Sequence, residues 1–230
     1  MIEERAYHGM SYAIVRGNSN RVCYILLPEG LNKDALDVVE SSALKYDCNV
    51  ILVTGMNWND DLTPWPAPGV FRKEKPFGGH AKDFLKELMS DAFPGLETSL
   101  NLHNPQRYLV GISLSGLFAL WAIFETNTFK AVASISGSLW YDKLEEWIKE
   151  RPMVNTSARI HLSLGDKEKN SKNARMANVE DATSRIASLL QDRGLRVDYQ
   201  IVQGTHFSPV APRLELALAS ILERELPISE

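Results

Sequence analysis

The stretch that decides the fold is RYLVGISLSGLFALWAIFE, residues 107–125. It begins as a short apolar run, typical of a buried strand, and continues as an apolar segment long enough for a buried helix. Glycines and serines stand at the join, where the chain has to turn sharply. A strand that passes directly into a helix is the unit from which parallel, helix-covered sheets are built.

The same alternation continues along the rest of the chain. Residues 21–28, 48–55, 129–137, 159–166 and 197–204 have the pattern of strands, and residues 32–46, 80–93, 141–150, 174–194 and 213–225 that of helices. This order predicts an α/β fold with a mostly parallel sheet covered by helices on both faces. Residues 6–17 are the candidate for an antiparallel edge strand, joined through a turn at 17–20. No linker or repeat divides the chain, so residues 1–230 are expected to form one domain.

Composition and charge restrict the classes of function. The chain is 44% hydrophobic and 23% charged, with a formal net charge of −4 and no basic stripe, so nucleic acid is not an expected partner. It has no run of roughly 18 apolar residues and no signal-peptide core at its start, so no membrane span is expected and a cytoplasmic location is the default. Cys23 and Cys48 are expected to be buried, reduced thiols.

Ser113 and Ser115 both stand at the join of strand and helix. A serine held on such a turn is a nucleophile elbow, usually G-x-S-x-G, in which the residues at −2 and +2 approach closely and must be small. For Ser113 these neighbours are Gly111 and Ser115, whereas Ser115 would have Leu117 at +2, which is too large. Ser113 is therefore the predicted nucleophile, and Gly116 is expected to let the helix pack close to the sheet. The alternative is an ordinary turn with small residues.

A serine hydroxyl needs a neighbouring base, normally a histidine oriented by a carboxylate. In hydrolases built on this kind of sheet, the acid and then the histidine follow the serine. Of the two histidines after Ser113, His161 lies inside a predicted strand, where a structural role is more common. His206 lies on the loop after the last strand and is the predicted base, the alternative being an exposed loop histidine. Glu168 is favoured as the acid by fold analogy, with Asp166 as the alternative.

The predicted mechanism also needs two backbone N–H donors for the oxyanion. One is expected from Leu114 and the other from Met56 or Asn57, which follow the strand at 48–55. The loop at 56–79 is long and rich in proline and aromatic residues, and it leaves the carboxyl end of a strand, where ligands bind in open α/β sheets. The candidate pocket residues are Trp58, Asp61, Trp65 and Trp140.

These pocket residues have a second interpretation, in which the loop carboxylates are solvated and the tryptophans only pack the loop down. Arg72, Lys73 and Lys75 form a small basic cluster on the same loop, more typical of a solvated face than of an anion site. No histidines have metal-ligand spacing and no phosphate-binding loop is present, so neither a metal nor a cofactor is expected.

Four segments, GISLSGLFALWA, VASISGSLWYD, LSLGDKEKN and VQGTHF, together with NWNDDLTPWPAP, resemble the putative esterase family of α/β-hydrolases. The similarity is to the branch of esterase D-like enzymes and enterobactin-type siderophore esterases, and most to its small cytosolic bacterial members. The resemblance implies an α/β-hydrolase fold without a large lid domain. It also implies a serine-esterase mechanism, with Ser113 as nucleophile, Glu168 or Asp166 as acid and His206 as base.

The sequence therefore predicts a serine hydrolase, a carboxylesterase that cleaves small soluble esters through an acyl-enzyme. A siderophore lactone or an acylated sugar is a narrower expectation that rests on the resemblance. Two alternatives remain: a thioesterase or acyltransferase with the same triad, and a catalytically silent scaffold that binds a partner. The oligomeric state stays open.

Overall fold

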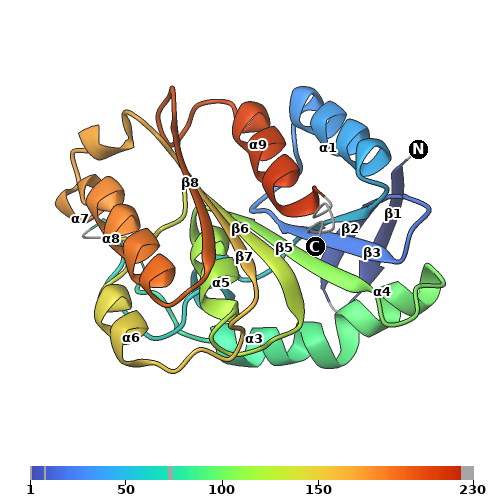
Figure 1. The fold of residues 1–230 in the computed structure, drawn as a ribbon, viewed down its shortest axis with the longest axis horizontal. Coiled ribbons are helices and arrows are strands. Elements are labelled where there is room, and N and C mark those ends of the chain that lie inside the picture. The colour runs from blue at the N-terminus through green and yellow to red at the C-terminus, as the bar shows by residue number, and fades with distance from the viewer. Residues whose placement is uncertain (1, 8, 72–74, 224–230) are drawn as a thin grey trace, which may run out of the picture.

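The structure is a computed structural model that describes residues 2–7, 9–71 and 75–223. Its centre is an eight-stranded sheet with the strand order β1-β2-β4-β3-β5-β6-β7-β8 (Figure 1). The strands are β1 (Ile2–Tyr7), β2 (Met10–Val15), β3 (Arg21–Leu26), β4 (Asn49–Thr54), β5 (Gln106–Ile112), β6 (Phe129–Ile135), β7 (Arg159–Gly165) and β8 (Arg196–Val202). β2 pairs antiparallel with β1 and β4, and the remaining neighbours are parallel. The predicted mostly parallel sheet is confirmed.

Helices cover both faces of this sheet. They are α1 (Lys33–Lys45), α2 (Trp58–Asp61), α3 (Ala81–Glu87), α4 (Phe93–Ser99), α5 (Leu114–Ala122), α6 (Leu144–Glu150), α7 (Ala174–Ala177), α8 (Val179–Asp192) and α9 (Ala211–Leu222). α1 and α9 lie on one face, and α3, α4, α5 and α6 lie on the other (Figure 1). Each face has its own cluster of buried apolar side chains. All nine residues of α5 are buried, so this helix lies at the centre of its layer.

The N-terminal segment differs from its prediction. Residues 6–17 do not form one edge strand: β1 and β2 form an antiparallel pair, and β2 then pairs with β4, although the turn at 17–20 leads into β3. Every residue of β3 is buried, which suits a central position between β4 and β5. β1 has no buried residue, which suits the outer edge of a sheet.

Two predicted helices also differ in extent. The helix expected at 80–93 continues through a single π-helical turn, Leu88–Ala92, into α4. The helix expected at 174–194 is divided at Asn178, which ends α7 and begins α8. Cys23 and Cys48 are buried free thiols, as predicted. Over the described parts of the chain, no helix has the length and apolar character needed to span a membrane.

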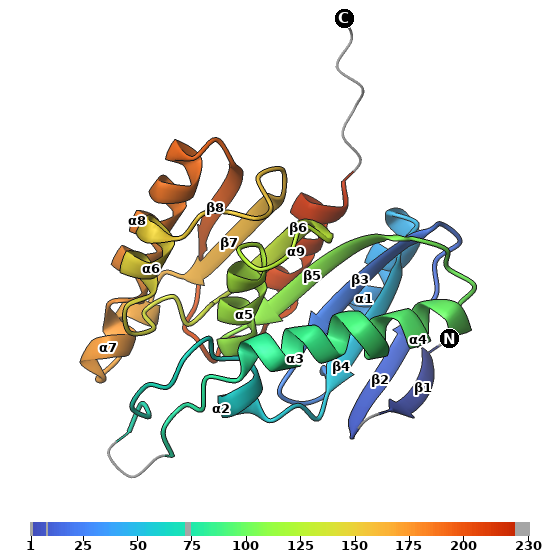
Figure 2. The same cartoon turned by 90° about the horizontal axis from the view of Figure 1, so that it is seen from below.

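The sheet order positions the site. Because β5 lies between β3 and β6, its carboxyl end is flanked by the ends of those two strands. The connection from β4 to α3 lies at the same end of the molecule as α7 (Figure 2). Segments that are far apart in sequence therefore meet around the turn between β5 and α5.

Candidate active site

Ser113 forms the turn between β5 and α5 in a strained backbone conformation. Its φ is 62° and its ψ is −121°, a combination that costs energy for any residue other than glycine. Two hydrogen bonds of 3.0 Å hold it there: its N–H donates to the Ile135 carbonyl, and its carbonyl accepts from the N–H of Ser138. The end of β6 thus fixes the turn on which Ser113 projects.

Gly111 and Ser115, the neighbours of Ser113 at −2 and +2, are in close contact as predicted. A Cβ atom on Gly111 would collide with the backbone carbonyl of Ser115. The Ser115 side chain is fully buried, and its Oγ accepts from the Ile112 N–H and donates to the Leu26 carbonyl, both at 2.7 Å. Ser115 therefore ties the turn to the end of β3 and has no surface to offer a substrate.

His206 and Glu168 lie beside Ser113, in a chain of hydrogen bonds. His206 Nε2 is 3.2 Å from Ser113 Oγ, and His206 Nδ1 is 2.9 Å from Glu168 Oε2. His206 lies on the loop between β8 and α9, and Glu168 follows β7. An ionised carboxylate on Nδ1 selects the tautomer with the proton on that nitrogen, which leaves the lone pair of Nε2 directed at the serine hydroxyl.

The second oxygen of Glu168 has several donors of its own. Oε1 accepts from the Gly165 N–H at 2.7 Å, from Ser136 Oγ at 2.7 Å and from Arg213 Nη1 at 3.1 Å. Burial by itself raises the pKa of Glu168, but the hydrogen bonds from His206, Ser136 and the Gly165 N–H outweigh it and lower the pKa below its usual value. Glu168 is therefore an ionised carboxylate at neutral pH.

Asp166, the alternative acid, does not contact His206. Its Oδ1 accepts from the Gly204 N–H at 2.8 Å, and its own N–H donates to the Val202 carbonyl at 2.8 Å. Asp166 thus fastens the turn after β7 to the loop that carries His206. Of the two candidate acids, the structure brings only Glu168 to the histidine.

The expected oxyanion donors fare differently. Leu114 is the first residue of α5, where N–H groups have no partner within the helix. The Asn57 N–H, in contrast, already donates to Asp61 Oδ2 at 2.7 Å. Met56 is on the same loop, which follows β4. Because β3 lies between β4 and β5, this loop does not follow the strand next to Ser113. The expectation for Asn57 is therefore wrong, because a carboxylate of its own loop occupies that N–H.

The long loop at 56–79 is fastened to neighbouring segments. Trp65 Nε1 donates to the Asp142 carbonyl at 2.9 Å, and Tyr141 Oη donates to the Trp65 carbonyl at 2.5 Å. Trp58 and Trp65 both pack against the core, and Asp61 accepts from its own loop, so these residues hold the loop in place. Burial raises the pKa of Asp61. Arg72 and Lys73, from the basic cluster, lie outside the described residues.

Trp140 directly precedes Tyr141, whose hydroxyl donates to the Trp65 carbonyl of this loop. The Arg175 guanidinium stacks 5.1 Å from the centre of the Trp140 ring and donates to the carbonyls of Pro68 and Gly69 at 2.9 and 3.1 Å. A surface cavity of about 600 Å³ borders Trp140, between residues 139–146 and helices α7 and α8. Phe207, which directly follows His206, is 89% exposed, and its ring packs edge-on against the His206 ring at a centroid distance of 5.3 Å.

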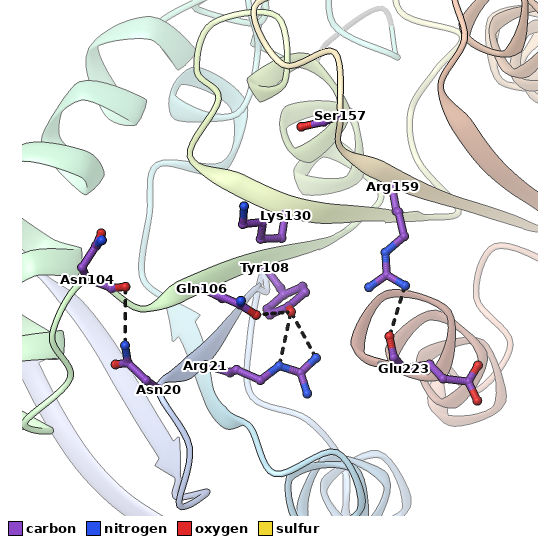
Figure 3. A pocket seen from close by; sticks show the side chains of 9 residues that line it. All are labelled: Asn20, Arg21, Asn104, Gln106, Tyr108, Lys130, Ser157, Arg159 and Glu223. Atoms are coloured by element: carbon purple, nitrogen blue, oxygen red, sulfur yellow. Dashed lines mark hydrogen bonds between the residues drawn. The ribbon is translucent and has the colours of Figure 1, made fainter. Parts of the chain in front are cut away.

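A larger cavity, of about 810 Å³, lies at the opposite edge of the sheet (Figure 3). Its lining includes Arg21, Gln106 and Arg159, the first residues of β3, β5 and β7, so it borders the amino ends of the parallel strands. Arg21 donates to the Leu222 carbonyl at 2.6 Å, and Arg159 donates to the Ile221 carbonyl at 2.7 Å. These arginines cap the carboxyl end of α9, and the lining contains none of the predicted site residues.

Sequence reasoning missed Ser136 and Arg213, which both contact Glu168. Ser136 is part of the SGSLW segment used for the resemblance, which was a usable signal. Arg213 offers no signal, because a single arginine in an amphipathic helix is normally assigned to the solvated face.

Comparison with known proteins places this chain in a family. A family model described as Putative esterase matches residues 31–210. The uncharacterized protein YbbA from Bacillus subtilis (strain 168) is 27% identical over 181 residues, which are 76% of this chain and 72% of YbbA.

Solved structures share the fold at low identity. An IroE-like serine hydrolase from Shewanella oneidensis superposes with a TM-score of 0.77 at 19% identity, over 95% of this chain and 78% of that one. The siderophore hydrolase EstA from Aspergillus nidulans gives 0.75 at 18%, over 96% and 93%. The enterobactin esterase FES from Shigella flexneri gives 0.66 at 14%, over 96% and 58%. The fold is thus that of the α/β-hydrolase-type esterases, and the chain belongs to the Putative esterase family.

Proposed function

We propose that this protein is a serine carboxylesterase in which Ser113 is the nucleophile, His206 the general base and Glu168 the acid that orients it. The observation that carries the proposal is the unbroken hydrogen-bond chain from Ser113 Oγ to His206 Nε2 and from His206 Nδ1 to Glu168 Oε2, at 3.2 and 2.9 Å. It starts at a serine whose φ is 62°. Strained backbone at a serine beside a histidine is typical of an activated nucleophile.

The reaction divides into two halves. His206 Nε2 takes the proton of Ser113 Oγ as that oxygen attacks the ester carbonyl, and the resulting imidazolium then gives the proton to the departing alkoxide. In the second half, His206 takes a proton from a water molecule as that water attacks the acyl-enzyme. The imidazolium then returns the proton to Ser113 Oγ, and the carboxylic acid leaves. Glu168 keeps the proton on Nδ1 and stabilises the imidazolium in both halves.

The oxyanion is stabilised by backbone donors around the turn. Leu114 supplies one N–H from the start of α5. The second is expected from residues 29–31, because β3 is the neighbour of β5, and hydrolases of this fold use the loop after that strand. Pro28 itself has no N–H to give.

The substrate that we propose is a small ester with aromatic groups. Phe207 beside His206 and Trp140 after β6 offer aromatic surfaces to such a molecule. Two of the structural relatives are named as a siderophore hydrolase and an enterobactin esterase, which makes siderophore esters the first natural compounds to assay.

The decisive test is labelling by a fluorophosphonate probe, which reacts with an activated serine. The wild-type protein is expected to take up one equivalent of probe, located at Ser113 by mass mapping. Ser113→Ala should lose the label, whereas Ser115→Ala should keep it at a reduced rate, because Ser115 only ties the turn to β3. A label on Ser115 would refute the assignment, and a folded wild-type protein that takes up no label would favour a silent scaffold. Matched oxygen esters and thioesters would then separate an esterase from a thioesterase.

A further inference from the structure

Arg213 is a buried cation directly behind the proposed acid. Only 3% of it is exposed, although it belongs to α9 on the outer layer of the fold. Its Nη1 donates to Glu168 Oε1 at 3.1 Å and also to Ser136 Oγ, and its Nη2 donates to the Ser208 carbonyl at 2.8 Å. A buried guanidinium is tolerated only when it is paired in this way, so removal of either partner is costly.

The contacts of Arg213 join three segments of the site. Ser136 belongs to the turn after β6, where its φ is 48°, and Ser208 belongs to the loop that carries His206. Ser136 Oγ accepts from Arg213 and donates to Glu168 Oε1 at 2.7 Å. Arg213 and Ser136 therefore contact one oxygen of Glu168, while His206 contacts the other.

The geometry points to a role for Arg213 as a positioning residue of the proposed triad. It holds the Glu168 carboxylate with Oε2 turned to the histidine, and its positive charge lowers the proton affinity of the Glu168–His206 pair. This inference rests on the proposed function, because it concerns the protonation of the same three side chains.

Few other titratable groups face the Glu168–His206 pair among the described residues. Asp166 lies on the turn after β7 and accepts from the Gly204 N–H of the histidine loop. Burial raises the pKa of Tyr199 in β8 to about 12, and the negative charge of Glu168 adds to this effect. The Tyr199 hydroxyl is therefore neutral. Among the described residues, Arg213 is thus the cationic side chain that donates a hydrogen bond to Glu168.

The sign of the effect follows from charge alone. Removing a positive charge raises the proton affinity of the Glu168–His206 pair, whichever of the two groups takes the proton. The acid limb of the pH–rate profile, where the pair takes up a proton and can no longer act as a base, then moves to higher pH. A residue with only a packing role would lower the plateau of the profile and leave its limb in place.

The experiment measures the rate of fluorophosphonate labelling against pH, which needs no knowledge of the substrate. Arg213→Met is expected to move the acid limb upward by about one pH unit, which makes labelling below the limb about tenfold slower. Arg213→Lys keeps the charge, so its limb should stay near the wild-type position while its plateau falls, since lysine cannot donate to both Ser136 and the Ser208 carbonyl.

Arg21→Met is the matched control, because it removes another buried arginine that donates to α9 at the opposite edge of the sheet. Its limb should not move. If Arg213→Met does not fold, Arg213→Gln keeps N–H donors without the charge and is expected to show the same shift.

Two failures can be distinguished. If the folded neutral variant has the wild-type limb and only a lower plateau, or if Arg213→Lys shifts the limb as far as the neutral variant does, the inference about Arg213 is wrong and the triad is unaffected. If wild-type Ser113 is not labelled at any pH, the proposed function itself fails.

Discussion

The two ends of helix α9 are both held by buried or half-buried arginines, but with different partners. Near its start, Arg213 reaches the carboxyl edge of the sheet and contacts the Glu168 carboxylate. At its other end, Arg21 and Arg159 lie at the amino edge (Figure 3). They donate to the carbonyls of Leu222 and Ile221. The same side chain is used at both edges, once with a carboxylate and once with backbone carbonyls at the end of the helix.

The difference shows what separates a site from a cavity. Carbonyl oxygens do not titrate, so the contacts of these arginines with α9 affect how firmly the helix is attached and are not expected to change with pH. At the carboxyl edge, the partner is a carboxylate that also contacts a histidine, so a change in the attachment of the helix is expected to change the protonation of the proposed site. Converging titratable groups favour the carboxyl edge as the place of the proposed site, although the larger cavity, of about 810 Å³, lies at the amino edge.

The largest effect on the rate of ester hydrolysis is expected when the Glu168 carboxylate is replaced by a neutral amide. Glu168→Gln should lower kcat/KM for an aryl ester by about 10³–10⁴-fold, because an amide can donate to His206 Nδ1 and so select the wrong tautomer. Asp166→Asn is the control, since asparagine can still accept from the Gly204 N–H, and a loss of less than about tenfold is expected. Equal losses in the two variants would contradict the choice of Glu168 as the acid.

A substitution at the amino edge should instead change the free energy of unfolding. Arg21 donates to Tyr108 Oη and to the carbonyls of Tyr46 and Leu222. Arg21→Met leaves these acceptors without their charged donor, and the free energy of unfolding should fall by about 2–4 kcal/mol. Urea denaturation measures this, while the labelling rate of the folded variant at 25 °C should be unchanged. A large loss of labelling rate in the folded variant would show that the two edges are coupled.

The smallest effect is expected from His161, in the middle of β7. This ring is fully buried, and its Nδ1 is 2.8 Å from Asp198 Oδ2. Burial lowers the pKa of His161 from its usual 6.5, against the opposing effect of Asp198. The unfolded chain therefore binds the proton more readily, so the contribution of His161 to stability is complete above pH 6.5 and is lost as the pH falls through the folded-state pKa.

His161→Gln should accordingly make the free energy of unfolding less dependent on pH between 7 and 5, by about 1 kcal/mol. Urea titrations at the two pH values test this. His103→Gln, at an exposed loop position, should keep the wild-type dependence. If the dependence is the same in all three proteins, His161 is not the group that responds.

The alternation of apolar runs predicts the sheet and its layers because buried parallel strands and their covering helices differ in length and period. The steric rule for the turn separates Ser113 from Ser115. Gly116 is needed for a separate reason: a Cβ there would be 2.9 Å from the Cα of Gly137, so the close approach of α5 to the turn after β6 requires glycine. The position of His206 after the last strand follows from the order of the elements alone.

Other features depend on pairings between distant segments, which local pattern does not contain. β3 lies between β4 and β5, so β2 pairs with β4 and not with β3, which follows it in the sequence. The engagement of the Asn57 N–H depends on the fold of its own loop around Asp61. Arg213 is oriented inward because Glu168 lies beneath it, and nothing within α9 itself distinguishes it from a surface arginine.

The position of Arg213 also bears on the order in which the site is completed during synthesis. The ribosome releases Ser113 first, then Glu168 and His206, and Arg213 only after all three. Until α9 emerges, one face of the sheet lacks the cover of Leu214, Leu218 and Ile221, and Glu168 lacks its cation. Because domains tend to fold as units once their chain is available, a nascent chain that stops before α9 would contain all three residues of the proposed triad without a completed fold to align them. The proposed activity is therefore expected to appear only after α9 has been synthesised.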